Sequence, residues 1–288
     1  MGRARSKSLM RGALAAAFLL VAAPVAMPPQ AAEAHVTGAV APYAERLQKA
    51  RAELLAAITL KDDPSPTARK LVATNIGRHG LEFAELSEIA FFTVADFMND
   101  HDPDVAAEGA WQVGILGEKY NKHSADALAA FRFSDGLLDD TNPARNMNIV
   151  RSSIIIGMKS EKLAYAGLGN LMTAVIDSHA EPGEHRNHVV AAAARGIGAL
   201  GMQYPSMAND ALGALERFAK ETSDADIVSG IIDGAASIGQ HTANKEVKAH
   251  ARRIISAYKN HPDKNVRWNA DFQTDYLDTH RLATAPQP

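Results

Sequence analysis

The chain is organised by a short hydrophobic pattern that recurs about every 40 residues. An apolar residue is followed by glycine at the end of each helical stretch of hydrophobic positions, and the residue four before the glycine is small or β-branched. The five pairs are Ile76-Gly77, Leu116-Gly117, Ile156-Gly157, Ile197-Gly198 and Ile238-Gly239. Self-similarity at a fixed period of this length is typical of stacked helical repeats. The pattern therefore predicts a solenoid.

A helix-opening signal precedes most of these glycines. The candidates are Pro64 or Pro66, Pro103, Pro143, Pro182, then Asp224, and finally Pro262. Proline suits a first helical turn because its missing N–H would be unsatisfied there anyway. Glycine suits a last turn because it reaches positive φ at little cost. We therefore expect each unit to be one helix bounded in this way, followed by a second helix.

The second helices follow the same hydrophobic periodicity. They are expected at 81–97, 124–133, 163–176, 207–219 and 247–258, after a separate N-terminal helix at about 42–60. The last unit has Val266, Trp268, Ala270 and Phe272 as its apolar positions and loses the pattern after Leu277, where Thr279-His280 stands in place of the expected pair. The predicted organisation is an N-terminal capping helix at 35–62, a solenoid of about six helix pairs at 63–282 and a disordered tail at 283–288.

Composition supports an all-α chain. The sequence has 288 residues, of which 47% are hydrophobic and 6% aromatic, and it contains no cysteine. The apolar content comes mostly from Ala, Leu, Ile and Val, and the alanines favour closely packed helices over a β-sandwich. Without disulfides, stability has to come from packing.

The first 34 residues have the features of a secretory signal peptide. Arg3, Arg5, Lys7 and Arg11 form a basic start, an apolar stretch follows at 12–27, and Ala32-Glu33-Ala34 supplies small residues for cleavage. The apolar stretch is short and interrupted by Pro24, so it does not predict a membrane span. We expect a mature protein that begins at His35, is periplasmic or secreted, and is monomeric.

Charge argues against a nucleic-acid partner. Cleavage after Ala34 would remove four basic residues and one acidic residue, and would change the formal charge from −3 to about −6. Nucleic-acid binding depends on phosphate neutralisation by a basic stripe, and the sequence contains no such run of Lys and Arg.

Two segments resemble the start of a HEAT repeat. The better match is Asp263-Lys-Asn-Val266-Arg267-Trp-Asn-Ala270, and the second is Asp102-Pro-Asp-Val105-Ala106, with alanine where arginine is usual. With the apolar-glycine endings, the chain resembles the short bacterial HEAT-like repeat proteins. The resemblance implies a right-handed curved α-solenoid whose second helices line a concave binding surface, and it implies no reaction.

The enzymes that share this architecture fit poorly. Deoxyhypusine hydroxylase needs His-Glu dipeptides for its irons, and this chain has none. Phycobilin lyases act inside cells, which conflicts with export, and DNA-glycosylase relatives need a basic concave face. The sequence also has no phosphate-binding glycine loop, no G-x-S-x-G and no H-E-x-x-H motif. We therefore expect a non-enzymatic protein without a cofactor.

One histidine cluster could bind a metal ion. His179, His185 and His188 lie near Glu181 and Glu184, and the last two histidines are three residues apart, so they share a helix face if the helix has begun. Imidazole and carboxylate groups are zinc ligands. The alternative is a polar loop between repeats with solvent-facing histidines. His35, as the mature N-terminus, could in addition chelate copper.

The function expected from these observations is a scaffold or adaptor that binds a protein partner. Exposed aromatic residues and arginines make good interface anchors. The candidates on the expected second helices are Phe91, Phe92, Tyr165, Arg217, Lys220, Arg252, Arg253 and Tyr258. The alternative function is binding of a metal or a small ligand through the His179–His188 cluster or through His35.

Overall fold

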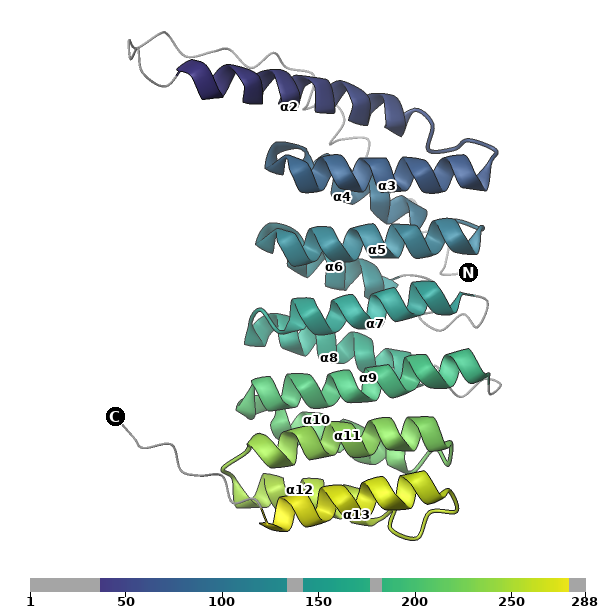
Figure 1. Cartoon of the computed structure of the whole chain (residues 1–288), viewed down its shortest axis with the longest axis vertical. Helices are drawn as coiled ribbons and strands as arrows, with labels where there is room; N and C mark the ends of the chain where they lie inside the picture. Colours follow the sequence, from purple (N-terminus) through teal and green to yellow (C-terminus); the bar gives the residue numbers. More distant parts are fainter. Residues whose placement is uncertain (1–36, 134–141, 177–182, 280–288) are drawn as a thin grey trace, which may run out of the picture. The chain divides into compact units, whose positions relative to one another are not determined.

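The computed structural model describes residues 37–133, 142–176 and 183–279. The predicted signal peptide, His35 and the predicted tail lie outside these ranges. The chain divides into two compact units, residues 1–45 and residues 46–288. All regular structure in the described ranges is helical, and the described part of residues 46–288 is a stack of packed helices (Figure 1). The predicted all-α solenoid is confirmed.

Within the described ranges, the stack contains five helix pairs and one further helix. After α2 (Thr37–Ile58), the pairs are α3 (Pro66–Glu82) with α4 (Ser87–Phe97), α5 (Pro103–Lys119) with α6 (Asn121–Phe133), α7 (Pro143–Gly157) with α8 (Glu161–Ile176), α9 (Glu184–Gln203) with α10 (Ala208–Ala219), and α11 (Ala225–His241) with α12 (Lys245–Ser256). The further helix is α13 (Lys264–Thr279). Short 3₁₀ turns, Ala84–Leu86 and Pro205–Met207, precede α4 and α10.

The helices form two layers. Each first helix packs against the next first helix, and this layer consists of α3, α5, α7, α9, α11 and α13 (Figure 1). Each second helix packs against the next second helix, and this layer consists of α4, α6, α8, α10 and α12. Among the described residues, no helix is both long enough and apolar enough to cross a membrane.

The predicted helix-opening residues are largely confirmed. Pro66, Pro103 and Pro143 stand in the first turns of α3, α5 and α7. The side chain before each proline caps the helix. Asp102 Oδ1, for example, accepts hydrogen bonds from the backbone N–H groups of Asp104 and Val105. Asp224 caps α11 in the same way. In the last unit, however, the cap is Asp263 and not Pro262, and Pro182 lies outside the described residues.

The repeating glycines do not end the helices at positive φ, as the sequence pattern suggested. None of the described glycines has a left-handed φ, and α5 and α11 continue for two residues past Gly117 and Gly239. Their role is close packing. An added Cβ on Gly117 would lie 2.6 Å from the Ala127 Cβ of the same unit and 2.9 Å from the Ile156 Cδ1 of the next. Glycine is required there because there is no room for a side chain.

This packing environment shows which glycines are equivalent. Each meets the second helix of its own unit and a leucine or isoleucine of the next first helix, and together they are Gly80, Gly117, Gly157, Gly201 and Gly239. We call these five the seam glycines. The predicted pairs of the first and fourth units, Ile76-Gly77 and Ile197-Gly198, are therefore wrong by one helical turn. In α13 the matching apolar residue is Leu277, so Asp278 holds the glycine position that the sequence pattern assigned to Thr279-His280.

Polar side chains connect successive units. The Tyr120 hydroxyl donates to the Leu81 carbonyl at 3.1 Å, and the Tyr204 hydroxyl donates to the Met158 carbonyl at 2.7 Å. Leu81 and Met158 each follow a seam glycine at the end of a first helix, where carbonyl groups lack partners within the helix. Each bond therefore closes the end of one unit with a side chain of the next.

Candidate binding surfaces

The predicted metal cluster is only partly within the described residues. His179 lies outside them, and His185 and His188 lie exposed near the start of α9. His188 Nδ1 is 3.9 Å from Asp226 Oδ2 of α11. Across the described ranges, no group of three or more His, Asp or Glu side chains is arranged to hold a metal ion. The site that includes His179 stays a prediction.

Two of the eight predicted interface residues belong to the core. Phe91 is 2% exposed and its ring stacks on the buried His123 ring at 4.9 Å. Tyr258 is 8% exposed, its hydroxyl donates to the Ala219 carbonyl at 3.3 Å, and burial raises its pKa to about 12. The prediction that they lie on the surface was wrong, because both side chains face other helices of the stack.

The remaining candidates are exposed on second helices. Phe92 on α4 and Tyr165 on α8 are each 46% exposed, and α6 lies between these two helices in the layer. Arg217 and Lys220 are on α10 or at its end, and Arg252 and Arg253 are on the neighbouring α12. Arg252 pairs with Asp278 of α13 at 2.7 Å. The structure thus brings the basic candidates together at one end of the layer, but it leaves the two aromatic residues apart.

Two glycines on the same layer differ from the seam glycines. Gly169 on α8 and Gly213 on α10 lie where an added Cβ would meet no atom within 4 Å. Glycine within a helix costs roughly 1 kcal/mol relative to alanine. Packing within the described chain therefore does not explain these two residues. Together with Tyr165, four residues before Gly169, they leave part of this surface open to close approach.

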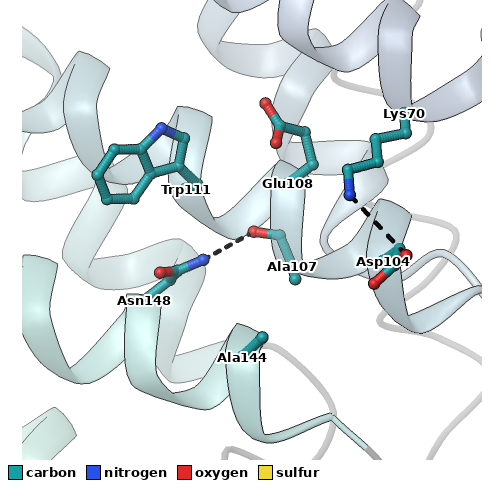
Figure 2. A pocket seen from close by; sticks show the side chains of 7 residues that line it. All are labelled: Lys70, Asp104, Ala107, Glu108, Trp111, Ala144 and Asn148. Carbon is teal, nitrogen blue, oxygen red and sulfur yellow. Dashed lines mark hydrogen bonds and ion pairs between the residues drawn. The ribbon is translucent and has the colours of Figure 1, made fainter.

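The first helices carry a shallow polar depression that sequence analysis missed. It holds about 320 Å³ and is lined by Lys70, Asp104, Ala107, Glu108, Trp111, Ala144 and Asn148 of α3, α5 and α7 (Figure 2). The Glu108 carboxylate already accepts hydrogen bonds from Thr74 and Gln112 at 2.8 and 2.6 Å. No sequence signal could have indicated it, because its walls come from three different units.

The Trp111 ring at the edge of this depression has a cationic neighbour. The Arg151 guanidinium of the next first helix, α7, lies 4.5 Å from the centroid of the Trp111 ring. This distance is within the range of a cation–π interaction. Both residues stand five positions before the apolar residue that packs on a seam glycine, Leu116 for Trp111 and Ile156 for Arg151.

The last first helix displays an aromatic stripe. Trp268 is 68% exposed and Phe272 is 51% exposed, and their rings stack at 5.5 Å with an interplanar angle of 12°. The Tyr276 ring is 6.5 Å from Phe272. We call these three residues the α13 aromatic stripe. Trp268 and Phe272 were predicted as apolar positions of the packed pattern, and this was wrong. Their spacing of four residues was the available signal, since it places all three on one helix face.

No family model matches the chain, and no curated protein matches it. Solved structures do. One crystal structure of an engineered protein has a TM-score of 0.50 and 14% sequence identity, and the match covers 78% of this chain and 96% of that chain. A second has a TM-score of 0.49 and 15% identity, over 79% and 99% of the two chains. A computationally designed armadillo repeat protein for modular peptide recognition has a TM-score of 0.49 and 16% identity, over 77% and 98%. At 14% sequence identity, the similarity to the engineered protein with the TM-score of 0.50 shows a shared fold alone and does not indicate a shared function. The chain is a helical repeat protein.

Proposed function

We propose that the chain is an exported, non-catalytic scaffold that binds a protein partner through the exposed side chains of its second helices. We call this the second-helix surface. The observation that carries the proposal is the exposure of Phe92 and Tyr165, large apolar side chains held on rigid helices. Buried aromatic anchors surrounded by a polar rim contribute much of the affinity of protein interfaces. The basic group Arg217, Lys220 and Arg253 would supply the rim at the α10 and α12 end.

The glycines of this surface support the proposal. The open space around Gly169 and Gly213 allows the backbone or a bulky side chain of a partner to approach the helices directly. Both glycines cost helix stability and serve no packing among the described residues, and close approach of a partner would give them a role.

We also propose that the repeats are of the HEAT type. Arg69 has the register of the arginine in the HEAT-like start, four residues after the helix cap, as Arg267 has in α13. The buried Arg69 guanidinium makes two hydrogen bonds to the Asp100 carboxylate, both at 2.8 Å, and a third to the Asp63 carbonyl. Arg267 likewise donates to the carbonyls of His261 and Pro262 before its helix. In both units the arginine fixes the turn that leads into the first helix.

Export is part of the same proposal and rests on the basic start, the apolar stretch and the Ala32-Glu33-Ala34 site. The location would be the periplasm or the extracellular space. Mass spectrometry of the protein recovered from a bacterial envelope fraction tests this directly, because cleavage after Ala34 gives an N-terminal peptide beginning with His35. An intact N-terminus in that fraction would contradict it.

The binding surface is tested by crosslinking and pull-down of the protein comprising residues 35–288 from the same envelope fraction. We expect recovery of a partner that falls by about tenfold or more in the Phe92→Ala/Tyr165→Ala variant. Gly213→Leu should block binding by filling the open space at this position, where an added Cβ meets no atom of the described residues within 4 Å. An unchanged circular dichroism spectrum checks that the variant keeps the fold.

The matched control is Leu71→Ala, which removes an exposed apolar side chain from the first helix α3. Recovery should be unchanged in this variant. A partner retained by the Phe92, Tyr165 and Gly213 variants would overturn the assignment to the second-helix surface. Elemental analysis of the same samples covers the alternative, since near-stoichiometric zinc or copper without a protein partner would favour a metal-binding function.

A further inference from the structure

We propose that the α13 aromatic stripe is a binding site for an arginine side chain presented by a segment of a protein partner. The inference rests on the proposed function in so far as the ligand belongs to a protein. It concerns a different surface, because α13 is a first helix and the proposed scaffold surface lies on the second helices.

The geometry of the stripe is the first argument. Trp268, Phe272 and Tyr276 follow one another at one-turn intervals, and the first two rings are stacked and more than half exposed. Exposed aromatic rings carry negative charge on their faces and attract a guanidinium, which can also lie flat on them. The exposed rings of Trp268 and Phe272 offer such a group two adjacent positions.

The chain itself shows what covers the corresponding position in another unit. Phe272 stands five residues before Leu277, as Trp111 stands five residues before Leu116, so the two rings have the same register on their helices. The Arg151 guanidinium of the following helix α7 lies 4.5 Å from the Trp111 ring centroid. Among the described residues, no helix follows α13 and no guanidinium lies over the Phe272 ring, which has the register of Trp111.

Arginine recurs at this register further along the layer. Arg195 stands five residues before Leu200 on α9, and its Nε donates to Asp233 Oδ2 of α11 at 2.9 Å. Asp233 stands five residues before Ile238. The two pairs, Trp111 with Arg151 and Arg195 with Asp233, each join neighbouring first helices through a guanidinium. On α13 the same register is held by Phe272, an aromatic ring that can accept one more guanidinium group.

Charge favours the same ligand. Asp271, Asp275 and Asp278 are exposed on α13 among the stripe residues, and Asp271 and Asp278 pair with Lys259 and Arg252 at 3.4 and 2.7 Å. Asp275 stands three residues after Phe272, so the two share a face of α13, and the described residues show no ion pair for the Asp275 carboxylate. A carboxylate beside aromatic rings favours a cation over a neutral apolar group.

The test uses fluorescein-labelled peptides and fluorescence anisotropy on the chain comprising residues 35–288. The probe is a short glycine peptide with two arginines, and its comparison peptides replace arginine by citrulline, which has nearly the same shape without the charge, or by lysine. We expect the arginine peptide to bind at least about fivefold more tightly than the citrulline peptide. Lysine should bind more weakly than arginine because it cannot stack as a plane.

Variants locate the site. Trp268→Ala/Phe272→Ala should weaken arginine-peptide binding about tenfold, and Asp275→Asn should weaken it by roughly threefold. These side chains are exposed, so the variants should keep the circular dichroism spectrum and melting temperature of the parent. The chain contains two tryptophans, so Trp111→Phe leaves Trp268 alone to report the bound peptide by a change in its fluorescence.

Tyr165→Ala is the control that separates this site from the second-helix surface. It should leave peptide binding unchanged, so the two proposals can fail independently. Equal affinity for arginine and citrulline peptides, or unchanged affinity in Trp268→Ala/Phe272→Ala, would overturn the inference. Binding of a cello-oligosaccharide to the stripe without binding of the arginine peptide would overturn it as well. Arg281 follows α13 in the sequence and lies outside the described residues. A large gain in affinity in Arg281→Ala would also overturn the inference, since the chain's own arginine would then compete with the peptide.

Discussion

At the scale of single residues, the glycines of this chain fall into two groups with opposite roles. Gly198 and Gly234 bring α9 and α11 into backbone contact, because an added Cβ on Gly198 would lie 2.3 Å from the Gly234 Cα. Gly213 has open space where its Cβ would be. The same residue type is therefore necessary in one layer and unfavourable, for the isolated chain, in the other.

This contrast predicts stability changes of opposite sign. Gly213→Ala should stabilise the protein by about 0.5–1 kcal/mol, because alanine gains helix propensity without a clash. Gly198→Ala should destabilise it by about 1–3 kcal/mol or more, because backbone atoms cannot make room for the methyl group. Urea unfolding followed by circular dichroism gives both values.

Gly169→Ala tests the stabilising effect a second time, because an added Cβ on Gly169, as on Gly213, meets no atom of the described residues within 4 Å. It should stabilise the chain by a similar amount as Gly213→Ala. A Gly198→Ala variant as stable as the parent would show that α9 and α11 are further apart than their glycine contacts indicate.

At the scale of elements, a buried histidine joins α4 and α6. His123 Nε2 is hydrogen-bonded to Ser87 Oγ at 3.1 Å, and the ring stacks on Phe91. Burial lowers the pKa of His123 below its ordinary value of 6.5, and the nearby Lys122 lowers it further, against smaller opposing effects of Asp126 and Glu88. The imidazole therefore binds a proton less readily in the folded protein than in the unfolded chain, where its pKa is near 6.5.

Acid should consequently destabilise the protein. A depressed histidine pKa contributes stability that is fully present above the unfolded pKa of 6.5 and is lost as the pH falls below it. The free energy of unfolding, measured in urea at pH 7.5, 6 and 5, should decrease over this range. His123→Gln should make the free energy of unfolding fall less between pH 7.5 and pH 5. His79→Gln should have a similar effect, because burial also lowers the pKa of His79. An unchanged slope in the double variant would refute this account.

The elements themselves could be predicted from the sequence, because their signals are local. Hydrophobic periodicity and the residues that open each helix lie within one helix, and α3, α5 and α7 begin where their prolines indicated. The register of the repeat could not be predicted, because it depends on contacts between units. Unit one offers both Gly77 and Gly80, and only the packing of Leu116 against Gly80 identifies the seam glycine.

The candidate site was predicted less well for the same reason. The sequence identifies Phe91 and Phe92 as adjacent aromatics on one helix, but only the contact with His123 shows that Phe91 is the buried one. Trp268 and Phe272 were assigned to packing because they continue the apolar pattern of earlier units. They are exposed because no other helix of the described residues packs over these two side chains.

At the scale of the whole stack, each unit is stabilised mainly by its neighbours, so a unit whose outer face meets water needs polar residues on that face. Counted from the seam positions, Asp271, Asp275 and Asp278 of α13 stand where α5 has Ala110, Gly114 and Gly117. Small residues at these positions let the next helix approach, and Gly114 and Gly117 are packed against α7. Three carboxylates at these positions disfavour the stacking of another helix, because that helix would have to bury the Asp275 carboxylate, which has no ion pair among the described residues, and the ion pairs of Asp271 and Asp278.

This acidic face predicts that the three aspartates limit self-association through α13. Asp271→Ala/Asp275→Ala/Asp278→Ala places small apolar residues at the stacking positions, so we expect this variant to associate more strongly than the parent as the protein concentration rises. Analytical ultracentrifugation over a range of protein concentrations measures this. Asp104→Ala/Asp210→Ala/Asp226→Ala is the matched control, because it removes three exposed carboxylates from the surface away from the α13 end face and should remain monomeric. If both triple variants associate equally, net charge and not the α13 face keeps the chain apart. If only the α13 variant associates, the three aspartates end the repeat array by excluding a further helix.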